Sequence, residues 1–518
     1  MPNHVFRKND LIRRLEAYLG KTLELIDNKG LFEQARKQNR QKGIAGSVVE
    51  QCIFDYPPDS AQEADLLIVD GDTLLKTELK TTGLLIENQP QKHFVAKEPM
   101  SITGVGIFDI VNQEFFTSHF WEKLEHVLII YYHYVSNHVV SPYEYKDFPL
   151  VGYEFHEFNA DDIQILKRDW EYVKSLCVTI ISKYPGKKDA AWKAAVKEEY
   201  IKTHGQLRKV LTYIDLAPKY PPRFRLKKPM VSSMVAEHFG YNLEQLPGRY
   251  LEISDLDEKC HTLTERYRGK TISQLATQFG IPPQEINNKG ITEQITISMF
   301  GGTSKKLNQI ELFERFGLIA KSIVITEKGF RTEDMKLFHI DFKEIVQTEY
   351  YDEGISRPFL FEDSEMYSYF ADHEFLCIIF EEPTDNIRNL SDDSSQRVSH
   401  PLGDNKFVGF KRLVFSEDFI ESIVRRLWND TRDKIINNKL VDYVRLKADG
   451  TPAMNKSGSI SSAPNFMKSK ENAVFIRGSG ADSSLKYKSE CVNGIRMLPQ
   501  YVWIKGTTVV KELGKLTE

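Results

Sequence analysis

Apolar and polar positions follow two different periods along this chain of 518 residues. Apolar residues that recur every three or four positions predict amphipathic helices, and apolar runs bounded by turn signals predict strands. Helices are predicted near residues 8–19, 44–52, 118–127, 161–182, 188–207, 230–240, 271–280 and 415–437. Strands are predicted near residues 64–69, 73–82, 127–135, 317–326, 374–381 and 407–414. Because both kinds of element occur throughout the chain, the pattern predicts an α/β fold.

Four short segments of the first half recur in the second half in the same order. They are GKTL (20–23) and GKTI (269–272), KGI (42–44) and KGI (289–291), LKRDWEYVKSL with Trp170 and VRRLWNDTRDK with Trp428, and PPRFRLKKPMVSSMV (221–235) and LPQYVWIKGTTVV (498–510). The preserved order predicts a duplicated chain. Two unrelated domains with chance similarities are the alternative. Both tryptophans are predicted to be core anchors.

The duplication and the length together predict two domains, because single hydrophobic cores stop growing at roughly 250–300 residues. We expect the first domain over 1–242, a linker over 243–260 and the second domain over 261–518. Polar insertions at 382–405 and 452–470 are predicted to be surface loops of the second domain.

Composition restricts the class of protein only mildly. A hydrophobic share of 41%, a charged share of 27% and a net charge of −4 are typical of a globular protein and neither favour nor exclude a DNA ligand. Five scattered cysteines without a C-x-x-C pair predict reduced thiols and no cysteine-based zinc site. The N-terminus lacks the apolar core of a signal peptide, and the apolar run at 127–135 is too short to span a bilayer. A cytoplasmic protein without membrane association is therefore expected.

The segment EADLLIVDGDTLLKTELKTT (63–82) brings acidic and basic residues together around a predicted hairpin. A D-G pair between two strand patterns is a turn signal, and residues placed symmetrically about a turn face each other. Asp65 should therefore lie across from the neighbourhood of Glu78 and Lys80. Because Glu78 and Lys80 are two positions apart, they share one face of their strand.

This trio suits phosphodiester hydrolysis. Asp65 and Glu78 offer the oxygen ligands that Mg²⁺ prefers, and the cation would polarise a phosphate and acidify a water. Lys80 could orient that water and stabilise the developing negative charge. Glu50, on the preceding predicted helix, is a fourth candidate.

Two aspartates at the hairpin tip, Asp70 and Asp72, are rivals for the role of Asp65. Asp72 lies about 20 Å from Glu78 along an extended strand, at roughly 3.3 Å per residue. This distance favours Asp65 and makes the tip aspartates turn residues.

Six segments, taken in order, resemble the MutH family, which includes a mismatch-repair nicking endonuclease and two-domain type II restriction endonucleases that cut at GATC. They are NRQKGIAGSVVEQCIF, the hairpin ending in TELKT, FFTSHFWEKLEHVLII, LKRDWEYV, TYIDLAPK and FRLKKPMVSSMVAEHF. With the internal repeat, the resemblance covers nearly the whole chain. It implies two tandem restriction-endonuclease-like domains, each with a mixed central sheet flanked by helices.

The resemblance also implies roles for the residues of the hairpin. Asp65, Glu78 and Lys80 would be the PD-(D/E)xK catalytic group, Glu50 the helix carboxylate beside it, and Mg²⁺ the cofactor. The family's first aspartate usually stands closer to its Glu than the 13 positions found here, which keeps Asp70 open as an alternative.

The second copy lacks the acidic residues of the first. Alignment of the repeats places Ile297 where Glu50 stood, Ile319 where Glu78 stood, and Lys321 where Lys80 stood. Loss of two carboxylates predicts a second domain that cannot hold Mg²⁺ in the same way. The resemblance implies that this domain binds DNA and regulates cleavage.

The resemblance implies that bases are read through a loop that follows an apolar strand. In the second copy, AVFIRGSGADSSLKYKSE (473–490) offers Arg477, Ser479 and Lys486 to base edges or phosphates, and Lys505 follows in the repeated segment. In the first copy the loop is shorter, with Ala217 where the family tends to have Arg and with Lys219 retained. The basic residues Arg223, Arg225, Lys227 and Lys228 are either phosphate ligands or a solvated positive face.

The function expected from these features is that of a Mg²⁺-dependent type II restriction endonuclease, which cuts unmodified double-stranded DNA at GATC or a related site. A strand-nicking repair endonuclease and a non-catalytic DNA-binding protein are the alternatives. One active site per chain predicts a monomer that dimerises on DNA. A cognate DNA methyltransferase is expected in the same cell.

Overall fold

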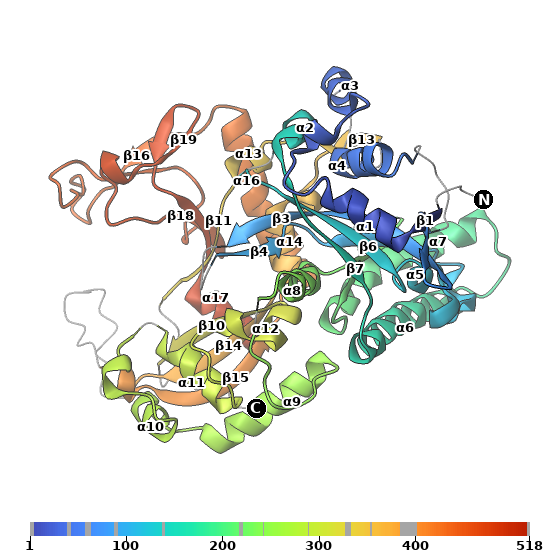
Figure 1. The fold of residues 1–518 in the computed structure, drawn as a ribbon. Coiled ribbons are helices and arrows are strands. Elements are labelled where there is room, and N and C mark those ends of the chain that lie inside the picture. Colours follow the sequence, from blue (N-terminus) through green and yellow to red (C-terminus); the bar gives the residue numbers. More distant parts are fainter. Residues whose placement is uncertain are drawn as a thin grey trace. The chain divides into compact units, whose positions relative to one another are not determined.

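The computed structural model describes residues 5–38, 43–56, 64–87, 92–136, 140–216, 221–241, 243–288, 290–326, 333–352, 355–383 and 401–514. The chain forms two compact units, which are described separately (Figure 1). Unit 1 comprises residues 1–259, 297–318 and 351–357, and unit 2 comprises residues 260–296, 319–350 and 358–518. Lys219, one of the predicted DNA ligands, lies outside the described residues.

A mixed sheet forms the centre of unit 1. Its strands are ordered β1 (Val5–Arg7), β2 (Leu66–Asp70), β3 (Thr73–Glu87), β6 (Val127–His133) and β7 (Leu150–His156), with β4 (His93–Ala96) paired to the far end of β3. The pairs β1–β2 and β3–β6 are parallel, and the pairs β2–β3 and β6–β7 are antiparallel. Six of the seven residues of β6 are buried, so this strand lies in the core.

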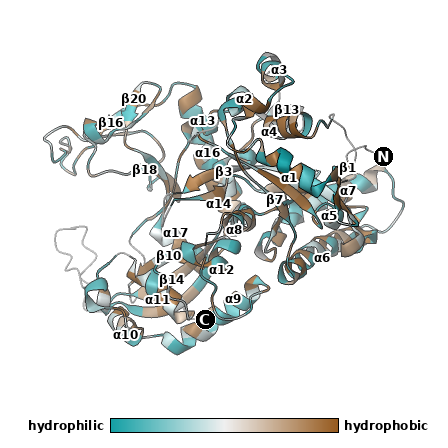
Figure 2. Ribbon diagram, viewed as in Figure 1, coloured by the Kyte–Doolittle hydropathy of each residue, from teal (hydrophilic) through white to brown (hydrophobic). Residues whose placement is uncertain are grey.

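Helices pack on the sheet of unit 1 through their apolar faces. They include α1 (Lys8–Glu16), α2 (Leu23–Ile26), α3 (Leu31–Gln38) and α4 (Ile44–Val48), which continues as a π-helix over Val49–Ile53. Leu11 of α1 and Val48 of α4 join one buried cluster with Ile68 and Leu128 of the sheet. The outward side of α1 is hydrophilic, as expected for a surface helix (Figure 2).

The rest of unit 1 is built around a small second sheet. Its antiparallel strands are ordered β5 (Met100–Gly104), β9 (Arg223–Leu226) and β8 (Ile214–Leu216). The helices of this part are α5 (His119–Glu122), α6 (Ala160–Lys183), α7 (Ala190–Thr203) and α8 (Lys228–His238). Helix α12 (Glu311–Arg315), which comes from the second half of the sequence, packs against α8.

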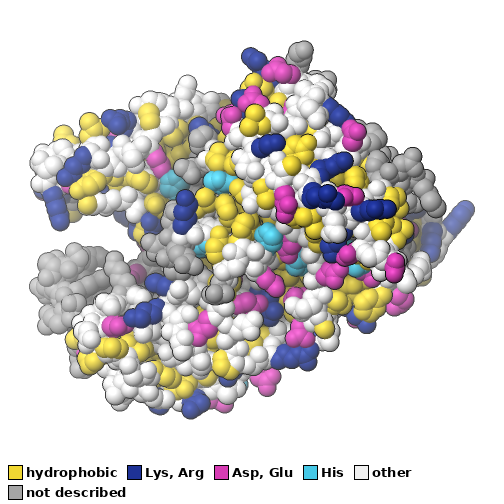
Figure 3. All heavy atoms as spheres, viewed as in Figure 1, with side chains coloured by type: hydrophobic (Ala, Val, Ile, Leu, Met, Phe, Trp, Pro, Cys, Tyr) yellow, Lys and Arg dark blue, Asp and Glu magenta, His cyan; other side chains and the backbone are white. Residues whose placement is uncertain are grey.

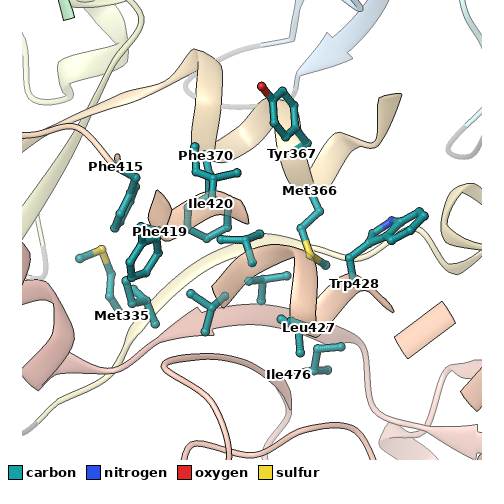
Figure 4. Close-up of a cluster of buried hydrophobic side chains, with 14 of the residues drawn as sticks. Met335, Met366, Tyr367, Phe370, Phe415, Phe419, Ile420, Leu427, Trp428 and Ile476 are labelled. Carbon is teal, nitrogen blue, oxygen red and sulfur yellow. The ribbon is translucent and has the colours of Figure 1, made fainter. Parts of the chain in front are cut away.

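Two further three-stranded sheets form the core of unit 2. One has the order β10 (Leu318–Ile325), β14 (Glu374–Glu381), β15 (Lys406–Leu413), and the other has the order β11 (Met335–His339), β21 (Gln500–Ile504), β18 (Val474–Gly478). Side chains from α14 (Glu365–Asp372), α15 (Glu417–Phe419), its π-helical continuation Ile420–Val424 and α16 (Arg425–Ile436) fill the core shown in Figure 4.

The remaining described elements are short or peripheral. They are α9 (Ile253–Tyr267), α10 (Ile272–Gln278), α11 (Ile291–Met299), α13 (Phe342–Ile345), α17 (Gly506–Leu513), β12 (Glu349–Asp352), β13 (Ile355–Pro358), β16 (Asp442–Val444), β17 (Ser462–Pro464), β19 (Glu490–Val492) and β20 (Ile495–Met497). Among the described residues, no helix combines the length and the apolar character needed to cross a bilayer.

The predicted helices and strands are all present, with two informative differences. Helix α5 ends at Glu122 instead of near 127, and β3 continues to Glu87 instead of ending at 82. The extension of β3 reflects pairing with β4, a partner that the local pattern does not reveal. Trp170 and Trp428 are buried, which confirms that both are core residues. Within the predicted connector, residues 253–260 form the first half of α9.

Candidate active site

The hairpin of β2 and β3 has the register expected from its D-G turn. Gly71 adopts φ +61° at the tip, a left-handed conformation that glycine tolerates without strain. Asp70 pairs with Thr73 and Leu66 pairs with Thr77. One step further along the same register, Asp65 lies across from Glu78. The structure thus brings together the two carboxylates that the sequence analysis placed opposite each other.

Glu78 is a buried carboxylate held by two lysines. The residue is 2% exposed. Its Oε1 accepts a hydrogen bond from Lys80 Nζ at 2.7 Å, and its Oε2 accepts one from Lys123 Nζ at 2.7 Å. Lys123 directly follows α5, so the site joins the hairpin to a helix 45 residues further along the chain. Each ammonium compensates part of the cost of burying the carboxylate.

Asp65 lies beside this group and shares its electrostatics. Its Oδ2 accepts a hydrogen bond from the amide of Leu79 at 2.9 Å. Burial, followed by the charge of Glu78, raises the pKa of Asp65 to about 6. Two carboxylates close enough to repel each other form a site that favours a cation or a proton.

The rival aspartates lie at the tip of the hairpin. Asp70 forms an ion pair with Lys8 at 2.5 Å, and its side chain is 45% exposed. Asp72 is exposed in the turn. Neither environment resembles the buried setting of Asp65, so the geometry favours Asp65 as the partner of Glu78.

Glu50 lies in the π-helical segment that continues α4, and α4 contacts β3. A Cβ added at Gly46 would come within 3.9 Å of Glu50 Oε1, so the Glu50 carboxylate lies back along its own helix. The predicted role of Glu50 beside the metal site stays a prediction.

The donor set of the hairpin fits a divalent cation that keeps most of its water. Among the described residues, no group of three or more His, Cys, Asp or Glu side chains forms a metal site. Asp65 and Glu78 nevertheless offer hard oxygen ligands, and Mg²⁺ commonly binds through one or two carboxylates plus waters and substrate phosphates. Burial, and then the charge of Glu78, raise the pKa of Asp65, and a bound cation would favour the ionised carboxylate against both effects.

Lys123 was not among the residues predicted from the sequence. It lies in FFTSHFWEKLEHVLII, one of the segments that carry the family resemblance, but its local pattern is that of an ordinary helix end. The available signal was topological. Strand β3 pairs in parallel with β6, and Glu78 pairs with Val127. A parallel pairing of the two predicted strands would have placed the residues just before β6 near Glu78.

The basic residues predicted to bind DNA in unit 1 are partly engaged inside the unit. Arg225 of β9 forms an ion pair with Asp215 of β8. Lys227 donates a hydrogen bond from Nζ to the carbonyl of Leu211 at 2.5 Å. Arg223 and Lys228 lie in the same stretch and are half-buried. The stretch is therefore not a single solvated face, and its contact with phosphates stays a prediction.

The predicted DNA ligands of unit 2 lie on and around β18 and β21. Arg477 pairs with Asp334 at 2.6 Å and stacks over Trp503. Ser479 accepts a hydrogen bond from Lys336 Nζ at 3.3 Å. Lys486 is exposed, and Lys505 precedes α17.

The counterparts of the acidic residues in the second half are hydrophobic and packed. Ile297 is fully buried, and Ile319 packs against the core of unit 2. Lys321 donates a hydrogen bond from Nζ to the carbonyl of Lys336 at 3.3 Å. The lysine that aligns with Lys80 therefore contacts backbone in the second half.

Comparisons with known proteins agree with these features. Residues 54–169, which contain Asp65, Glu78, Lys80 and Lys123, match the family model described as DNA mismatch repair enzyme MutH. A curated relative, the type II restriction enzyme Sau3AI of Staphylococcus aureus, is 22% identical over 389 residues, which cover 70% of this chain and 71% of that protein. The resemblance to MutH-like restriction endonucleases implied by the sequence motifs is thereby confirmed.

Proposed function

We propose that this MutH-like chain is a type II restriction endonuclease, which uses Mg²⁺ to hydrolyse phosphodiester bonds of unmodified double-stranded DNA at GATC or a related short site. The observation that carries the proposal is the buried Glu78 between Lys80 and Lys123, with Asp65 opposite. The names of the matched family and relative make DNA the expected substrate.

In the proposed mechanism, Asp65 and Glu78 hold the cation. When bound, Mg²⁺ would polarise the scissile phosphate and acidify a water molecule. Lys80, whose Nζ lies beside Glu78, would orient the water that attacks phosphorus. Lys123 stabilises negative charge that develops on the phosphate oxygens. Glu50 supports the site from the neighbouring helix.

We further propose that the chain is a tandem duplication over residues 1–242 and 261–518, joined by 243–260. The sheet orders support this. In the first half, β6 lies between the earlier strand β3 and the next strand β7. In the second half, β14 lies in the same way between the earlier strand β10 and the next strand β15. The small antiparallel sheets β5–β9–β8 and β11–β21–β18 also share one order, in which the last strand lies in the middle.

Hydrogen bonds made by the repeated GKT segments support the same conclusion. The amide of Gly20 donates to the carbonyl of Leu150 in β7, and the amide of Gly269 donates to the carbonyl of Phe407 in β15, both at 2.8 Å. Both glycines have positive φ, +78° and +81°. Each segment then begins a short helix, α2 or α10.

A buried aromatic contact recurs as well. Ser118 caps α5 and Ser364 caps α14, and in each half a Phe three positions earlier contacts a Trp of the next long helix. The pairs are Phe115–Trp170, with ring centroids 6.0 Å apart, and Phe361–Trp428, with ring centroids 5.8 Å apart.

Aligning the two serine caps also predicts the chemistry of the second copy. Tyr369 then stands where Lys123 stands in the first copy, in addition to the replacement of Glu78 by Ile319. Of the positions that align with Glu50, Glu78, Lys80 and Lys123, the second copy retains only Lys321. We propose that it is catalytically inactive and binds DNA through residues such as Arg477, Ser479, Lys486 and Lys505.

Digestion of unmethylated plasmid DNA with Mg²⁺ tests the proposal. The wild type should give discrete ends whose sequence defines the site, and Glu78→Ala should give no cleavage while retaining DNA binding. Asp65→Asn should also be inactive, and Asp70→Asn should cleave like the wild type. The reverse result for the two aspartates would move the first carboxylate to Asp70.

Two other outcomes would change the functional class. Nicked circles that never become linear would indicate a strand-nicking repair endonuclease. DNA binding by the wild type without cleavage under any divalent cation would indicate a non-catalytic DNA-binding protein. Protection of the host sequence by a methyltransferase would be checked by digesting DNA methylated at the mapped site.

A further inference from the structure

Residues 441–497 of unit 2, here called the arm, contain the short hairpins β16–β17 and β19–β20 and, between them, strand β18 of the core sheet (Figure 1). Large apolar side chains of the arm face solvent. Those that are more than half exposed are Tyr443, Leu446, Met454, Ile460 and Leu485. Solvent-exposed apolar side chains gathered on one element mark an interaction site more often than scattered ones do.

Away from strand β18, polar side chains make up much of the interior of the arm. Asn455 is buried, and its Oδ1 accepts hydrogen bonds from the amide and the hydroxyl of Ser483. Ser461 and Ser483 share a hydrogen bond of 2.9 Å. Lys488 is buried and donates to Asp442 at 2.9 Å and to Ser462 at 2.6 Å. These polar contacts stabilise the hairpins of the arm, while the large apolar side chains named above remain exposed to solvent.

The apolar side chains are carried on ordered backbone. Leu446 pairs with Pro452 and Met454 pairs with Ile460 in isolated bridges. Arg445 bonds through its amide to the carbonyl of Ser461, at 2.8 Å. The side chains therefore project from a hydrogen-bonded frame, which lowers the entropy that binding would cost.

The arm is positively charged although the chain is negative. Residues 441–497 contain nine Lys and Arg against five Asp and Glu, a net +4, whereas the whole chain has a net −4. The acids are engaged locally, as in the pairs Asp442–Lys488 and Glu490–His339. Within the part of the chain that the structure describes, no ion pair includes Arg445, Lys447, Lys456, Lys470 or Lys486.

We propose that this arm is a contact surface for double-stranded DNA, in which Arg445, Lys447 and Lys456 meet backbone phosphates and Leu446, Met454 and Ile460 meet sugars and base edges. Lysine is depleted in protein–protein interfaces, whereas cations beside apolar side chains suit a nucleic-acid groove. Figure 3 shows Lys and Arg side chains next to hydrophobic ones over the region of β16 and β19. The proposal rests on the proposed function only in taking DNA as the ligand.

Equilibrium binding of a labelled duplex of about 30 base pairs, without divalent cation and over a salt series, tests the arm. Each phosphate contact contributes about 0.9 to the slope of log affinity against log salt. The triple variant Arg445→Gln, Lys447→Gln, Lys456→Gln should bind at least tenfold more weakly, with a slope smaller by about 2–3. The double variant Leu446→Ser, Met454→Ser should weaken binding with the slope unchanged.

A matched control removes three lysines of unit 1 that are also exposed, Lys187, Lys188 and Lys193. It should leave affinity within about twofold of the wild type. An equal loss in the control and in the arm variant would overturn the proposal, because binding would then follow total charge. Unchanged melting temperatures are expected for the arm variants, since the replaced side chains are exposed.

Two further readouts separate the possible failures. If the arm variants bind DNA like the wild type while Glu78→Ala still abolishes plasmid cleavage, the arm proposal falls and the nuclease stands. If the wild type never cleaves but the arm variants still lose binding, the arm stands and the nuclease falls. A change of oligomeric state in Leu446→Ser, Met454→Ser, with DNA affinity unchanged, would assign the surface to a second copy of the chain and overturn the proposal.

Discussion

At the scale of single residues, the neighbours of Glu78 define the chemistry of the site. A carboxylate that is 2% exposed and contacted by two ammonium groups is held in one orientation. The two lysines differ in origin, since Lys80 shares the strand of Glu78 and Lys123 follows a helix. Each can therefore be removed without disturbing the backbone that carries the other.

Lys123→Met should lower the single-turnover cleavage rate by about 10²–10³-fold, the loss typical of one group that stabilises developing charge. Lys76→Met is the matched control, because Lys76 lies on the strand of Glu78, is 65% exposed and pairs with Glu122 of α5 instead of Glu78. The control should cleave at the wild-type rate. If Lys123→Met cleaves at the wild-type rate and only its melting temperature changes, Lys123 serves as a counter-ion of Glu78 and takes no part in cleavage.

Asp65→Asn should stabilise the protein at neutral pH while abolishing cleavage. The pKa of Asp65 is raised from 3.8 to about 6, so the folded protein loses stability as the pH rises from about 4 through about 6. A shift of this size corresponds to at most about 3 kcal/mol in the free energy of unfolding.

Thermal unfolding of Asp65→Asn and of the wild type should be compared from pH 4 to pH 8. The difference in melting temperature should be small at pH 4, where Asp65 is protonated in the folded state and only partly ionised in the unfolded state, and should reach a plateau above pH 7. A difference that is constant over this range would show that the charge of Asp65 is not the cause.

The residues of the hairpin could be placed from the sequence because turn chemistry and strand periodicity are local. Asp65, Glu78 and Lys80 follow from a D-G turn and a two-residue repeat. Lys123 reaches the same carboxylate from 45 positions away, through the parallel pairing of β3 with β6. No local pattern encodes that pairing.

At the scale of elements, the buried carboxylate of Asp169 ties α6 to the start of β8. Asp169 is 1% exposed and accepts hydrogen bonds from the amides of Thr212, Tyr213 and Ile214, at 2.7–3.0 Å. Burial raises the pKa of Asp169 to about 6, against the opposing effect of these hydrogen bonds. The carboxylate thus fixes the strand that leads towards the predicted DNA-reading loop.

Asp169→Ala should lower the free energy of unfolding by about 3 kcal/mol, because buried amide donors would lose their acceptor. Asp161→Ala, on the first turn of the same helix, is the control. Asp161 is 43% exposed and pairs with Arg249 at the surface, so its loss should lower the free energy of unfolding much less than the loss of Asp169 does. Chemical denaturation of both variants measures the difference, and equal effects would contradict the proposed anchoring.

Long elements were predictable and short ones were not. Helix α6 and strand β6 have lengths over which their periods are evident. Strands β8 and β9, of three and four residues, are too short to show a period. They exist because β5 pairs with β9 from more than 100 positions away in the sequence.

At the scale of the whole molecule, one active site per chain has a consequence for double-strand cleavage. We expect the enzyme to pair on DNA, each chain cutting one strand. Excess Glu78→Ala protein added to the wild type should then form mixed pairs, so that nicked circles accumulate from a single-site plasmid. Gel analysis of the products measures the ratio of nicked to linear DNA.

The same measurement without the mutant is the control, and it should give mainly linear product. Equal slowing of both products in the mixture would indicate simple competition for the site. Cleavage whose rate is linear in enzyme concentration, with single-site DNA cut as fast as two-site DNA, would exclude pairing.

The boundaries of the two compact units could not be predicted from the sequence. Residues 297–318 lie in the second half of the sequence but fold as part of unit 1, where α12 contacts α8. The same segment is also held by the carboxylate of Glu244, which accepts hydrogen bonds from the amides of Thr303 and Ser304. Contacts of this kind join distant positions and leave no repeat or period in the chain.

The pairing of two acidic with two basic side chains at the hairpin also bears on the order in which ligands enter. With Asp65 and Glu78 ionised and Lys80 and Lys123 charged, the formal charge of the group is zero, so an approaching phosphate meets no electrostatic barrier before the metal arrives. Below a pH of about 6, protonation of Asp65 makes the group a net cation. Acidification should then raise the affinity for DNA and lower the rate of hydrolysis. Binding and cleavage would therefore have opposite dependences on pH.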